Sequence, residues 1–172
     1  MHKLPNSLPD FGTAIAGQGG SFAAIMRGLT IDGVQQAPMA LIVADRAHHL
    51  ACAWGERGRT IAGCDSRIDG QANTLAMLLE DCPAAKHARS ITVDGHSDFF
   101  VPAIGQLNTA AANAPELFDS ERVYWSSTQY SSYFAIAQDF EVSFSLWNVK
   151  YGEFLVVPVR VIPLQLLITS TL

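Results

Sequence analysis

The sequence predicts an α+β domain in which strands come first, two helices follow, and a run of strands closes the chain. Two segments, around 71–82 and 102–115, carry leucine, isoleucine and alanine at helical spacing. After Glu121 the apolar segments are short, aromatic or β-branched, and separated by turn-forming residues. This order differs from the regular alternation of strands and helices that builds a parallel sheet, and the chain lacks the glycine-rich nucleotide-binding motifs.

The N-terminal part predicts an arm followed by two strands. Residues 1–20 combine two prolines with four glycines, which is typical of an extended arm or linker. "SFAAIMRGLTIDG" and "APMALIVADR" then predict two strands, and the apolar run in the second is typical of a buried strand. Asp32-Gly33 is a turn signal between them.

Two helices are expected in the middle of the chain. The first contains leucines at helical spacing, Leu75, Leu78 and Leu79, and either Asp69 or Asn73 can cap its first turn. Pro83 interrupts this segment, and "SITVDG" predicts a short strand before a loop. The second helix is expected in "PAIGQLNTAAANAPELF", because Pro102 suits a first helical turn and the apolar residues share a face as far as Pro115.

Four β segments are expected after the second helix: "VYWSST", "FAIAQDFE", "VSFSLWNV" and "EFLVVPVRVI". Period-two alternation in the third places Phe144 and Leu146 on one side of the strand and Ser145 and Trp147 on the other. Both sides therefore carry an aromatic ring, so we expect at least one of the two rings to be partly exposed or in an interface.

Composition and charge exclude several kinds of partner. The 172-residue chain has a formal net charge of −5 and no cluster of lysines and arginines, so we expect no nucleic-acid partner. Because no apolar run reaches the roughly 18 to 20 residues that cross a bilayer, we expect no membrane insertion, and prolines and glycines stand where a secretory signal would be apolar. With 49% hydrophobic and only 16% charged residues, we expect apolar surface to face a partner chain, as in a homo-oligomer.

Metal and cofactor chemistry is not indicated. Three cysteines, Cys52, Cys64 and Cys82, are an odd number without C-x-x-C spacing, which favours buried reduced thiols over disulfides or zinc. Asp65, Asp69 and Asn73 are spaced by four and could offer oxygen ligands to calcium, but the pattern of a calcium loop is absent. Helix capping and turns are the preferred interpretation, and no metal or cofactor is expected.

A catalytic serine is also not indicated. Ser126 and Ser127 lie in "VYWSSTQYSS" without the sharp elbow on which a nucleophilic serine commonly sits. "DGHSD", with His96 between two aspartates, is chemically suggestive, but the same residues form tight polar turns. The carboxylate pairs available to a glycan-cleaving enzyme after residue 90 are Asp94 with Asp98 and Asp139 with Glu141. We therefore predict no enzymatic activity, and keep a glycan-cleaving enzyme only as the third hypothesis.

The aromatic residues of the C-terminal third predict a binding surface. Tyrosine and tryptophan give large, rigid contact area at low entropic cost, and serine and asparagine beside them supply adaptable hydrogen bonds. The competing interpretation is that half of these rings alternate into the core. The residues expected to contact a receptor or partner are Tyr130, Tyr133, Phe134, Trp147, Asn148 and Tyr151.

Several stretches together resemble the DUF1566 family: "DGHSDFFVPAIGQLN", "YWSSTQYSS", "AIAQDF" and "VVPVRVI". That family is similar to the C-type-lectin-like fold, which also includes formylglycine-generating enzymes and the variable proteins of diversity-generating retroelements. The preceding segment, with "GSFAAIMRG" and "GCDSRIDGQANTLAML", resembles the version found in tailed bacteriophages and prophages. The resemblance spans 21–162.

The resemblance implies a C-type-lectin-like fold with two helices packed on short, twisted antiparallel sheets. It implies that one group of residues holds the second helix against the sheet: Asp98, Phe99, Pro102 and Leu107. A second group would form a central strand whose hydroxyls satisfy buried backbone groups: Trp125, Ser126 and Ser127. A third would form the closing strand that brings the C-terminus back toward the N-terminus: Val157, Val159 and Arg160.

The chain also departs from these relatives. Val157 stands where the family has a basic residue, so a salt bridge there is lost. The sugar-binding motifs of calcium-dependent lectins are absent, because Trp147 and Asn148 are followed by Val149. All three cysteines precede residue 83, which does not fit the copper-binding cysteine pair of the formylglycine enzymes.

These observations predict a non-enzymatic receptor-binding module of a bacteriophage tail. Residues 1–20 would join the domain, 21–162, to the particle, and the loops around 128–153 would face a bacterial surface receptor, either glycan or protein, or other phage tail proteins. The alternative is a structural tail or baseplate protein that contacts only phage proteins. In either case we expect the protein in the virion tail, after synthesis in the host cytoplasm, with the apolar tail 163–172 packed on a neighbouring subunit.

Overall fold

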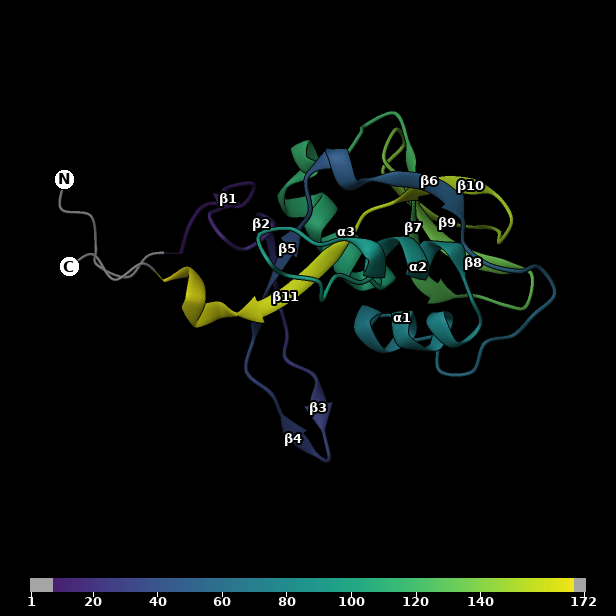
Figure 1. Ribbon diagram of the computed structural model, residues 1–172, viewed down its shortest axis with the longest axis horizontal. Coiled ribbons are helices and arrows are strands. Elements are labelled where there is room, and N and C mark those ends of the chain that lie inside the picture. Colours follow the sequence, from purple (N-terminus) through teal and green to yellow (C-terminus); the bar gives the residue numbers. More distant parts are fainter. Residues whose placement is uncertain (1–7, 169–172) are drawn as a thin grey trace.

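The computed structural model describes residues 8–168 and shows a mixed α+β architecture (Figure 1). Within these residues there are three α-helices, two larger sheets and a separate two-stranded hairpin. The predicted α+β class is confirmed. The prediction of two helices is wrong, because a further helix begins at Pro83.

The first sheet joins the two ends of the described chain. Its order is β1 (Ala14–Ile15), β2 (Gly20–Met26), β5 (Met39–Val43) and β11 (Val159–Pro163), and all neighbours are antiparallel. β5 is central and almost entirely buried, as its continuous apolar run predicts. Because β2 and β11 flank the same strand, the early and late parts of the chain lie side by side (Figure 1).

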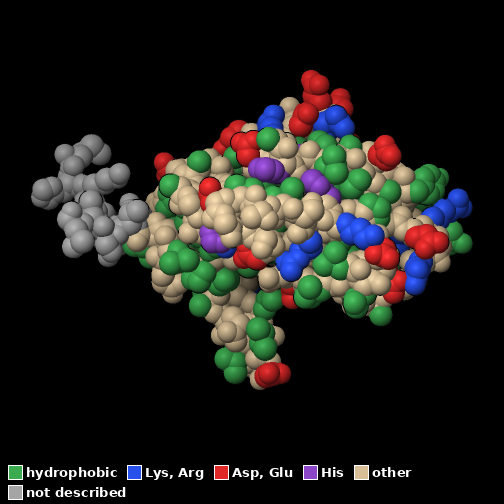
Figure 2. Space-filling model, viewed as in Figure 1, with side chains coloured by type: hydrophobic (Ala, Val, Ile, Leu, Met, Phe, Trp, Pro, Cys, Tyr) green, Lys and Arg blue, Asp and Glu red, His purple; other side chains and the backbone are tan. Residues whose placement is uncertain are grey.

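A hairpin projects from this sheet as a finger. Its strands are β3 (Thr30–Ile31) and β4 (Val34–Gln35), joined by Asp32 and Gly33 with φ of 49° and 77°. Positive φ at both positions is the requirement of a type I′ turn, so the predicted turn is present. The finger stands clear of the main body, with apolar side chains near its tip (Figures 1 and 2).

The second sheet carries the C-terminal strands. Its order is β6 (Leu50–Ala53), β10 (Glu153–Val156), β7 (Val123–Gln129), β8 (Phe134–Asp139) and β9 (Phe144–Val149). β10 runs parallel to β7, and the other pairs are antiparallel. β7 is therefore the central strand, and its five central residues are buried.

The helices cover both faces of the second sheet. α1 (Gly70–Leu79) and α2 (Pro83–Ser90) pack on one face around Trp54 and Trp125. α3 (Ile104–Asn113) packs on the other face, between the two sheets. Short 3₁₀ turns complete the fold: η1 (Arg46–His48), η2 (Pro115–Leu117) and η3 (Leu164–Leu167).

Three segments predicted as single strands have a different structure. The first, "SFAAIMRGLTIDG", forms β2 and then β3 of the finger, which belong to different sheets. "EFLVVPVRVI" forms both β10 and β11, which belong to different sheets, because the chain crosses from one sheet to the other at Val157 and Pro158. "SITVDG" contributes only an isolated bridge between Val93 and His96, across a tight turn in which Asp94 and Gly95 have φ of 52° and 79°.

The predicted terminal segments are described in part. Within the predicted arm, β1 pairs with β2, and the Gly12 amide donates to the Phe22 carbonyl at 2.7 Å. Within the predicted apolar tail, Leu167 is buried against Ile42 and Ile162 of the same chain. Residues 1–7 of the arm and 169–172 of the tail lie outside the described residues.

Candidate binding surface

The hydroxyl groups of β7 are internal. The Ser126 hydroxyl donates to the Ile136 carbonyl at 2.6 Å, and the Thr128 hydroxyl donates to the Ser66 carbonyl at 2.9 Å. Ser127 Oγ accepts from Asn73 Nδ2 at 3.2 Å. All three side chains are buried, so they satisfy polar groups of the core instead of facing solvent.

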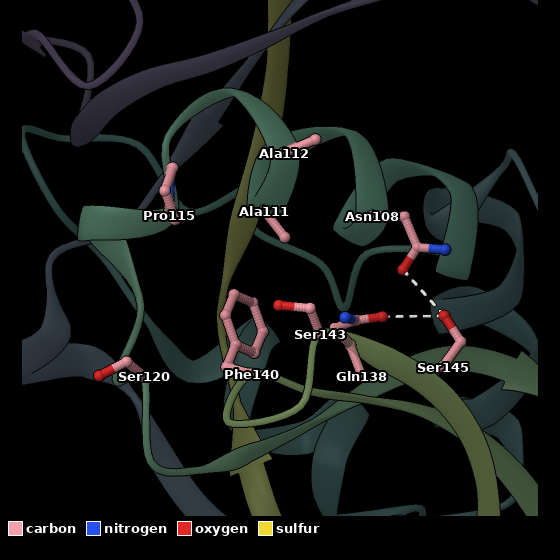
Figure 3. A pocket seen from close by; sticks show the side chains of 9 residues that line it. All are labelled: Asn108, Ala111, Ala112, Pro115, Ser120, Gln138, Phe140, Ser143 and Ser145. Atoms are coloured by element: carbon pink, nitrogen blue, oxygen red, sulfur yellow. Dashed lines mark hydrogen bonds between the residues drawn. The ribbon is translucent and has the colours of Figure 1, made fainter.

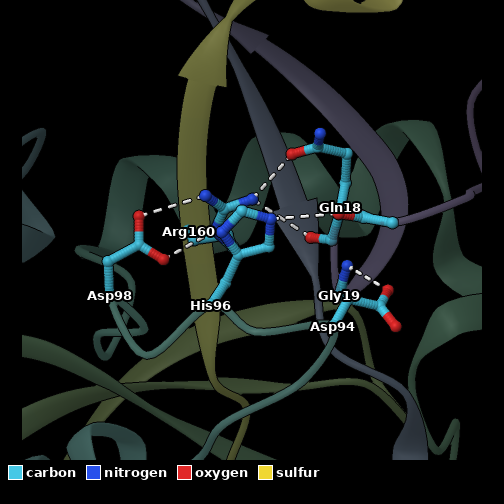
Figure 4. Close-up of polar contacts among 7 residues, drawn as sticks. Gln18, Gly19, Asp94, His96, Asp98 and Arg160 are labelled. Carbon is cyan, nitrogen blue, oxygen red and sulfur yellow. Dashed lines mark hydrogen bonds and ion pairs between the residues drawn. The ribbon is translucent and has the colours of Figure 1, made fainter.

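The polar segment "DGHSD" is a tight turn that holds the N-terminal segment (Figure 4). Asp94 Oδ2 accepts from the Gly19 amide at 2.9 Å, and His96 Nε2 lies 3.0 Å from the Gly17 carbonyl. Asp98 pairs with Arg160 through two bonds, 2.7 and 3.2 Å long. Each of the three side chains that suggest catalysis thus has a structural partner.

Arg160 is the centre of this turn region. Its guanidinium is nearly buried, and it also donates to the Gln18 carbonyl and side chain at 3.2 and 2.9 Å (Figure 4). Burial raises the pKa of Asp98, but the hydrogen bond and positive charge of Arg160 outweigh this, and the net shift is downward. Arg160 therefore connects β11, the 94–98 turn and residue 18 in one network.

Most of the predicted binding residues meet at one end of the second sheet. This end consists of the β7–β8 turn, 130–133, the β9–β10 turn, 150–152, and the loop 55–61. Four of the six predicted side chains are well exposed, with exposed fractions of 58% for Tyr130, 47% for Tyr133, 59% for Trp147 and 56% for Tyr151. Separate segments of the chain thus place large aromatic rings at one end of the molecule.

Tyr130 and Trp147 form what we call the stacked pair. Their ring centroids are 5.3 Å apart and their planes differ by 13°. Two exposed rings in this arrangement limit each other's rotation, since each forms a wall for the other. The pair is a flat aromatic area that is already formed before any partner binds.

Tyr133 and Tyr151 meet through Arg57, and these three residues are called the arginine clamp. The guanidinium carbon of Arg57 lies 5.3 Å from the centre of the Tyr133 ring and 5.8 Å from that of Tyr151. Both distances are within the range of cation–π attraction. Sequence reasoning does not find Arg57, because nothing in "GERGR" indicates that it meets tyrosines more than 70 residues away.

The other two predicted residues contribute less surface. Phe134 and Asn148 are half-buried, and the Asn148 side chain accepts a hydrogen bond from the neighbouring Val149 amide at 2.9 Å. The stacked pair and the arginine clamp together are called the display surface below.

The two parts of the display surface lie on opposite faces of the sheet. Residues paired across strands lie on the same face of the sheet, and so do residues two apart in one strand. Trp147 pairs with Ile136, and Gln138, two residues further along, pairs with Tyr124, which lies in the core under α3. The stacked pair is therefore on the α3 side. The arginine clamp adjoins Lys150, whose ammonium lies over the Trp54 ring in the core under α1 and α2. The 130–133 turn connects the two parts.

Buried polar groups fix the loop that carries Arg57. The Lys150 ammonium donates to the Arg59 carbonyl and to Gln129 Oε1, both at 2.7 Å. Gln129 also exchanges two hydrogen bonds with the backbone of Ile61, at 2.9 and 3.1 Å. The Gly58 amide donates to the Ser132 carbonyl at 2.9 Å, which ties the loop to the tyrosine-bearing turn.

A shallow groove of about 320 Å³ lies apart from the display surface, between α3 and the β8–β9 turn (Figure 3). Its walls are small or uncharged: Asn108, Ala111, Ala112, Pro115, Ser120, Gln138, Phe140, Ser143 and Ser145. The Ser145 hydroxyl lies 2.8 Å from Gln138 Oε1 and 3.2 Å from Asn108 Oδ1. The groove offers hydrogen-bonding groups but no acid, base or cation among its walls.

The thiols and acidic residues form no further site in the described part of the chain. All three cysteines are free, and burial raises the pKa of Cys52 and Cys82 to about 11 and that of Cys64 to about 12. Thiols with such pKa values are weak nucleophiles at neutral pH. Across 8–168, no three His, Cys, Asp or Glu side chains gather as metal ligands.

The helices between residues 8 and 168 are all too short or too polar to span a bilayer. A scan against models of known protein families found no match to this chain, and neither did a search of curated proteins.

Proposed function

We propose that this protein is a non-enzymatic receptor-binding module of a bacteriophage tail, built on a C-type-lectin-like scaffold. The observation that carries the proposal is the display surface, a set of exposed tyrosine, tryptophan and arginine side chains held in place by buried hydrogen bonds. The phage-tail setting comes from the resemblance to the DUF1566 family. The partner is a glycan or protein of the host surface.

The topology supports the scaffold. Strands from the two ends of the described chain flank β5, and the helices pack against a second sheet that carries the later strands. β7, with Trp125 and its buried hydroxyls, is central, as the resemblance implies. Asp98 and Arg160, both implied to be fold-determining, form an ion pair.

The composition of the display surface supports binding. Tryptophan, tyrosine and arginine are the residues that most often dominate binding energy at protein interfaces. Arg57 is exposed, and no carboxylate among the described residues lies within ion-pair distance of it. Its hydrogen-bond donors are therefore free for an acceptor on a partner, while the two tyrosine rings limit its motion.

The polar clusters support a non-enzymatic role. The serines of β7 and the acidic and histidine side chains of the 94–98 turn each bond to the protein itself. In the other carboxylate pair, Asp139 with Glu141, the Asp139 side chain accepts a hydrogen bond from the Glu141 amide at 3.0 Å in the β8–β9 turn. Release of reducing sugar from host glycan by the purified protein would contradict this part of the proposal.

A structural tail protein is the second candidate, and a different surface favours it. Apolar residues lie exposed on α1, at Leu75 and Leu79, just before it, at Ile68, and at the finger, at Ile31 and Val34. Exposed apolar groups away from the display surface fit permanent contacts with other tail proteins. In that case the purified protein would bind tail components and not cells.

Binding of the purified protein to host bacteria, with a non-host strain as reference, tests the choice. A receptor-binding module binds host cells, and Tyr133→Ala and Trp147→Ala reduce binding while leaving the circular dichroism spectrum unchanged. Leu79→Ala, at an exposed apolar position on α1, is the control and keeps full binding. Absence of host-cell binding by the unmodified protein, together with binding to other tail proteins, would favour the structural role.

A further inference from the structure

The outer edge of β9 has hydrogen-bonding groups without partners. β9 is the last strand in the order of the second sheet. The Lys150 amide donates to the Tyr133 carbonyl, so that pair belongs to the hydrogen-bonded set. Because hydrogen-bonded and non-hydrogen-bonded pairs alternate in an antiparallel ladder, Leu146 and Asn148 bond to β8, whereas Ser145, Trp147 and Val149 direct their backbone groups outward.

Only part of this outward row is satisfied within the chain. The Val149 amide donates to the Asn148 side chain and the Val149 carbonyl accepts from Gly152. The outward N–H and C=O groups of Ser145 and Trp147 have no protein partner among the described residues. These two residues lie on either side of Leu146.

β9 also lacks the features that normally protect an edge strand. "FSLWNV" contains no charge and no proline, and its six pairs with β8 run without a bulge. The other edges of the two sheets are different: β1 has two residues, β6 has four, and β11 ends at Pro163. An uncharged six-residue edge strand that itself carries the exposed side chains of Phe144 and Trp147 is a template for another strand.

We propose that β9 pairs with β9 of a second copy of this chain, antiparallel and centred on Leu146, to form a two-fold dimer with a continuous sheet. In this register Ser145 of one copy faces Trp147 of the other, and each exchanges both backbone hydrogen bonds with its counterpart. Every unpartnered group of Ser145 and Trp147 is thereby used. The unpartnered groups of Ser145 and Trp147 are arranged symmetrically about Leu146. Under a two-fold axis through Leu146 this edge is complementary to itself, and this favours a second copy as the partner.

The dimer would also combine the two stacked pairs. A two-fold axis perpendicular to the sheet keeps both Trp147 side chains on the same face, as diagonal neighbours about 7 to 8 Å apart across the new pair of strands. Two stacked pairs would then form one aromatic area. The pairing itself rests on the backbone edge alone and stands or falls independently of the receptor.

Light scattering on the full-length protein measures the dimer directly. We expect about twice the chain mass of 18.6 kDa. Ser145→Pro removes an outward N–H without breaking the ladder to β8, so it should give the single-chain mass. Ser145→Ala is the control: it loses the same hydroxyl hydrogen bonds but keeps the N–H, and should remain dimeric. A single-chain mass for the unmodified protein, or a dimeric and folded Ser145→Pro, would overturn the proposal.

Disulfide trapping tests the register and does not depend on how Ser145→Pro folds. Leu146 would face its own copy in a non-hydrogen-bonded pair about 4.5 Å apart between Cα atoms, within the range of a disulfide. Leu146→Cys should therefore give a cross-linked dimer on mild oxidation. Residue 144 lies on the same face but two residues from the axis, so the two copies of Phe144→Cys are roughly 13 Å apart. The cross-linked fraction of this variant should therefore not exceed that of the unmodified protein. Equal cross-linking of the two variants, or none in either, would contradict the register.

Discussion

Lys150 is a buried ammonium that joins three segments at the display end of the second sheet. It contacts the Arg59 carbonyl, the Gln129 side chain and the face of Trp54. Burial lowers the pKa of this ammonium, because the charged form is less solvated inside the protein. The hydrogen bonds and the indole face offset part of that cost and hold the loop that carries Arg57.

Replacing this ammonium should loosen the loop. In Lys150→Met the side chain keeps its length, but a charge-assisted hydrogen bond to the Arg59 carbonyl is lost, at a cost of roughly 1.5 kcal/mol or more. We expect the Gly58 and Ile61 amides to exchange hydrogen about tenfold faster or more in native-state measurements. Lys86→Met, at an exposed lysine, is the control. Unchanged exchange at both amides in Lys150→Met would show that Lys150 does not hold the loop.

His49 makes stability depend on pH. Its Nε2 lies 3.1 Å from the Ala44 carbonyl and its Nδ1 3.1 Å from the Tyr124 hydroxyl. That hydroxyl accepts from the Asp119 amide, so its proton points to Nδ1, and one neutral tautomer satisfies every group. Burial is the main reason that the pKa of His49 falls from 6.5 to about 4.

The His49 imidazole therefore binds a proton more readily in the unfolded chain than in the folded protein. Its contribution to stability is complete above pH 6.5 and is lost as the pH falls from 6.5 toward 4, by up to about 3 kcal/mol. Urea unfolding between pH 4 and 7.5 measures this change. His49→Gln should remove this part of the slope, and a slope identical to that of the unmodified protein would contradict the assignment.

At the scale of elements, β7 organises the fold through its hydroxyls as well as its rings. The Thr128 hydroxyl donates to the Ser66 carbonyl and accepts the Ile104 amide at 3.0 Å, at the first turn of α3. One buried side chain thus fixes the start of α3 and the loop before α1. This role explains why a strand rich in serine and threonine lies in the centre of a sheet.

Thr128→Val should therefore destabilise the protein, although the volume of the side chain hardly changes. The buried Ile104 amide loses its acceptor, while the Ser66 carbonyl keeps its hydrogen bond from the Asn73 side chain at 2.7 Å. We therefore expect the free energy of unfolding to fall by about 1 to 3 kcal/mol in urea titrations. Thr109→Val, on α3, removes a hydroxyl that donates only to the Gly105 carbonyl of its own helix, and its effect should stay within about 0.5 kcal/mol. Equal effects of the two changes would refute a special role for Thr128.

Local patterns predict most elements where each is strongly periodic or apolar. β5, α3, β8 and β9 fall within predicted segments, and α1 and β7 each extend one residue beyond theirs. α2 escapes sequence reasoning because Pro83 indicates a break, whereas proline at the first helical position lacks only an N–H that has no helical partner. The division of "EFLVVPVRVI" into two strands also escapes, because both halves have the same β pattern and only the two sheets separate them.

At the scale of the whole molecule, the candidate site is predictable in part. The exposure of the three tyrosines follows from their residue type and their place in turns between predicted strands, and that of Trp147 from alternation along β9. Their division into two parts follows from the register of β8 and β9, which the sequence does not show. Arg57 joins Tyr133 and Tyr151 only because the fold brings the 55–61 loop to the far end of the second sheet.

The most direct test of the receptor-binding proposal is the apparent Kd of the purified protein for host bacteria after loss of Arg57. The proposal predicts that Arg57→Ala weakens binding by at least about tenfold, because a central arginine between two aromatic rings has the character of a binding hot spot. Arg89→Ala removes the same charge from the exposed end of α2 and should leave the Kd unchanged. Equal Kd values for Arg57→Ala and the unmodified protein would contradict the display surface as the receptor-binding face.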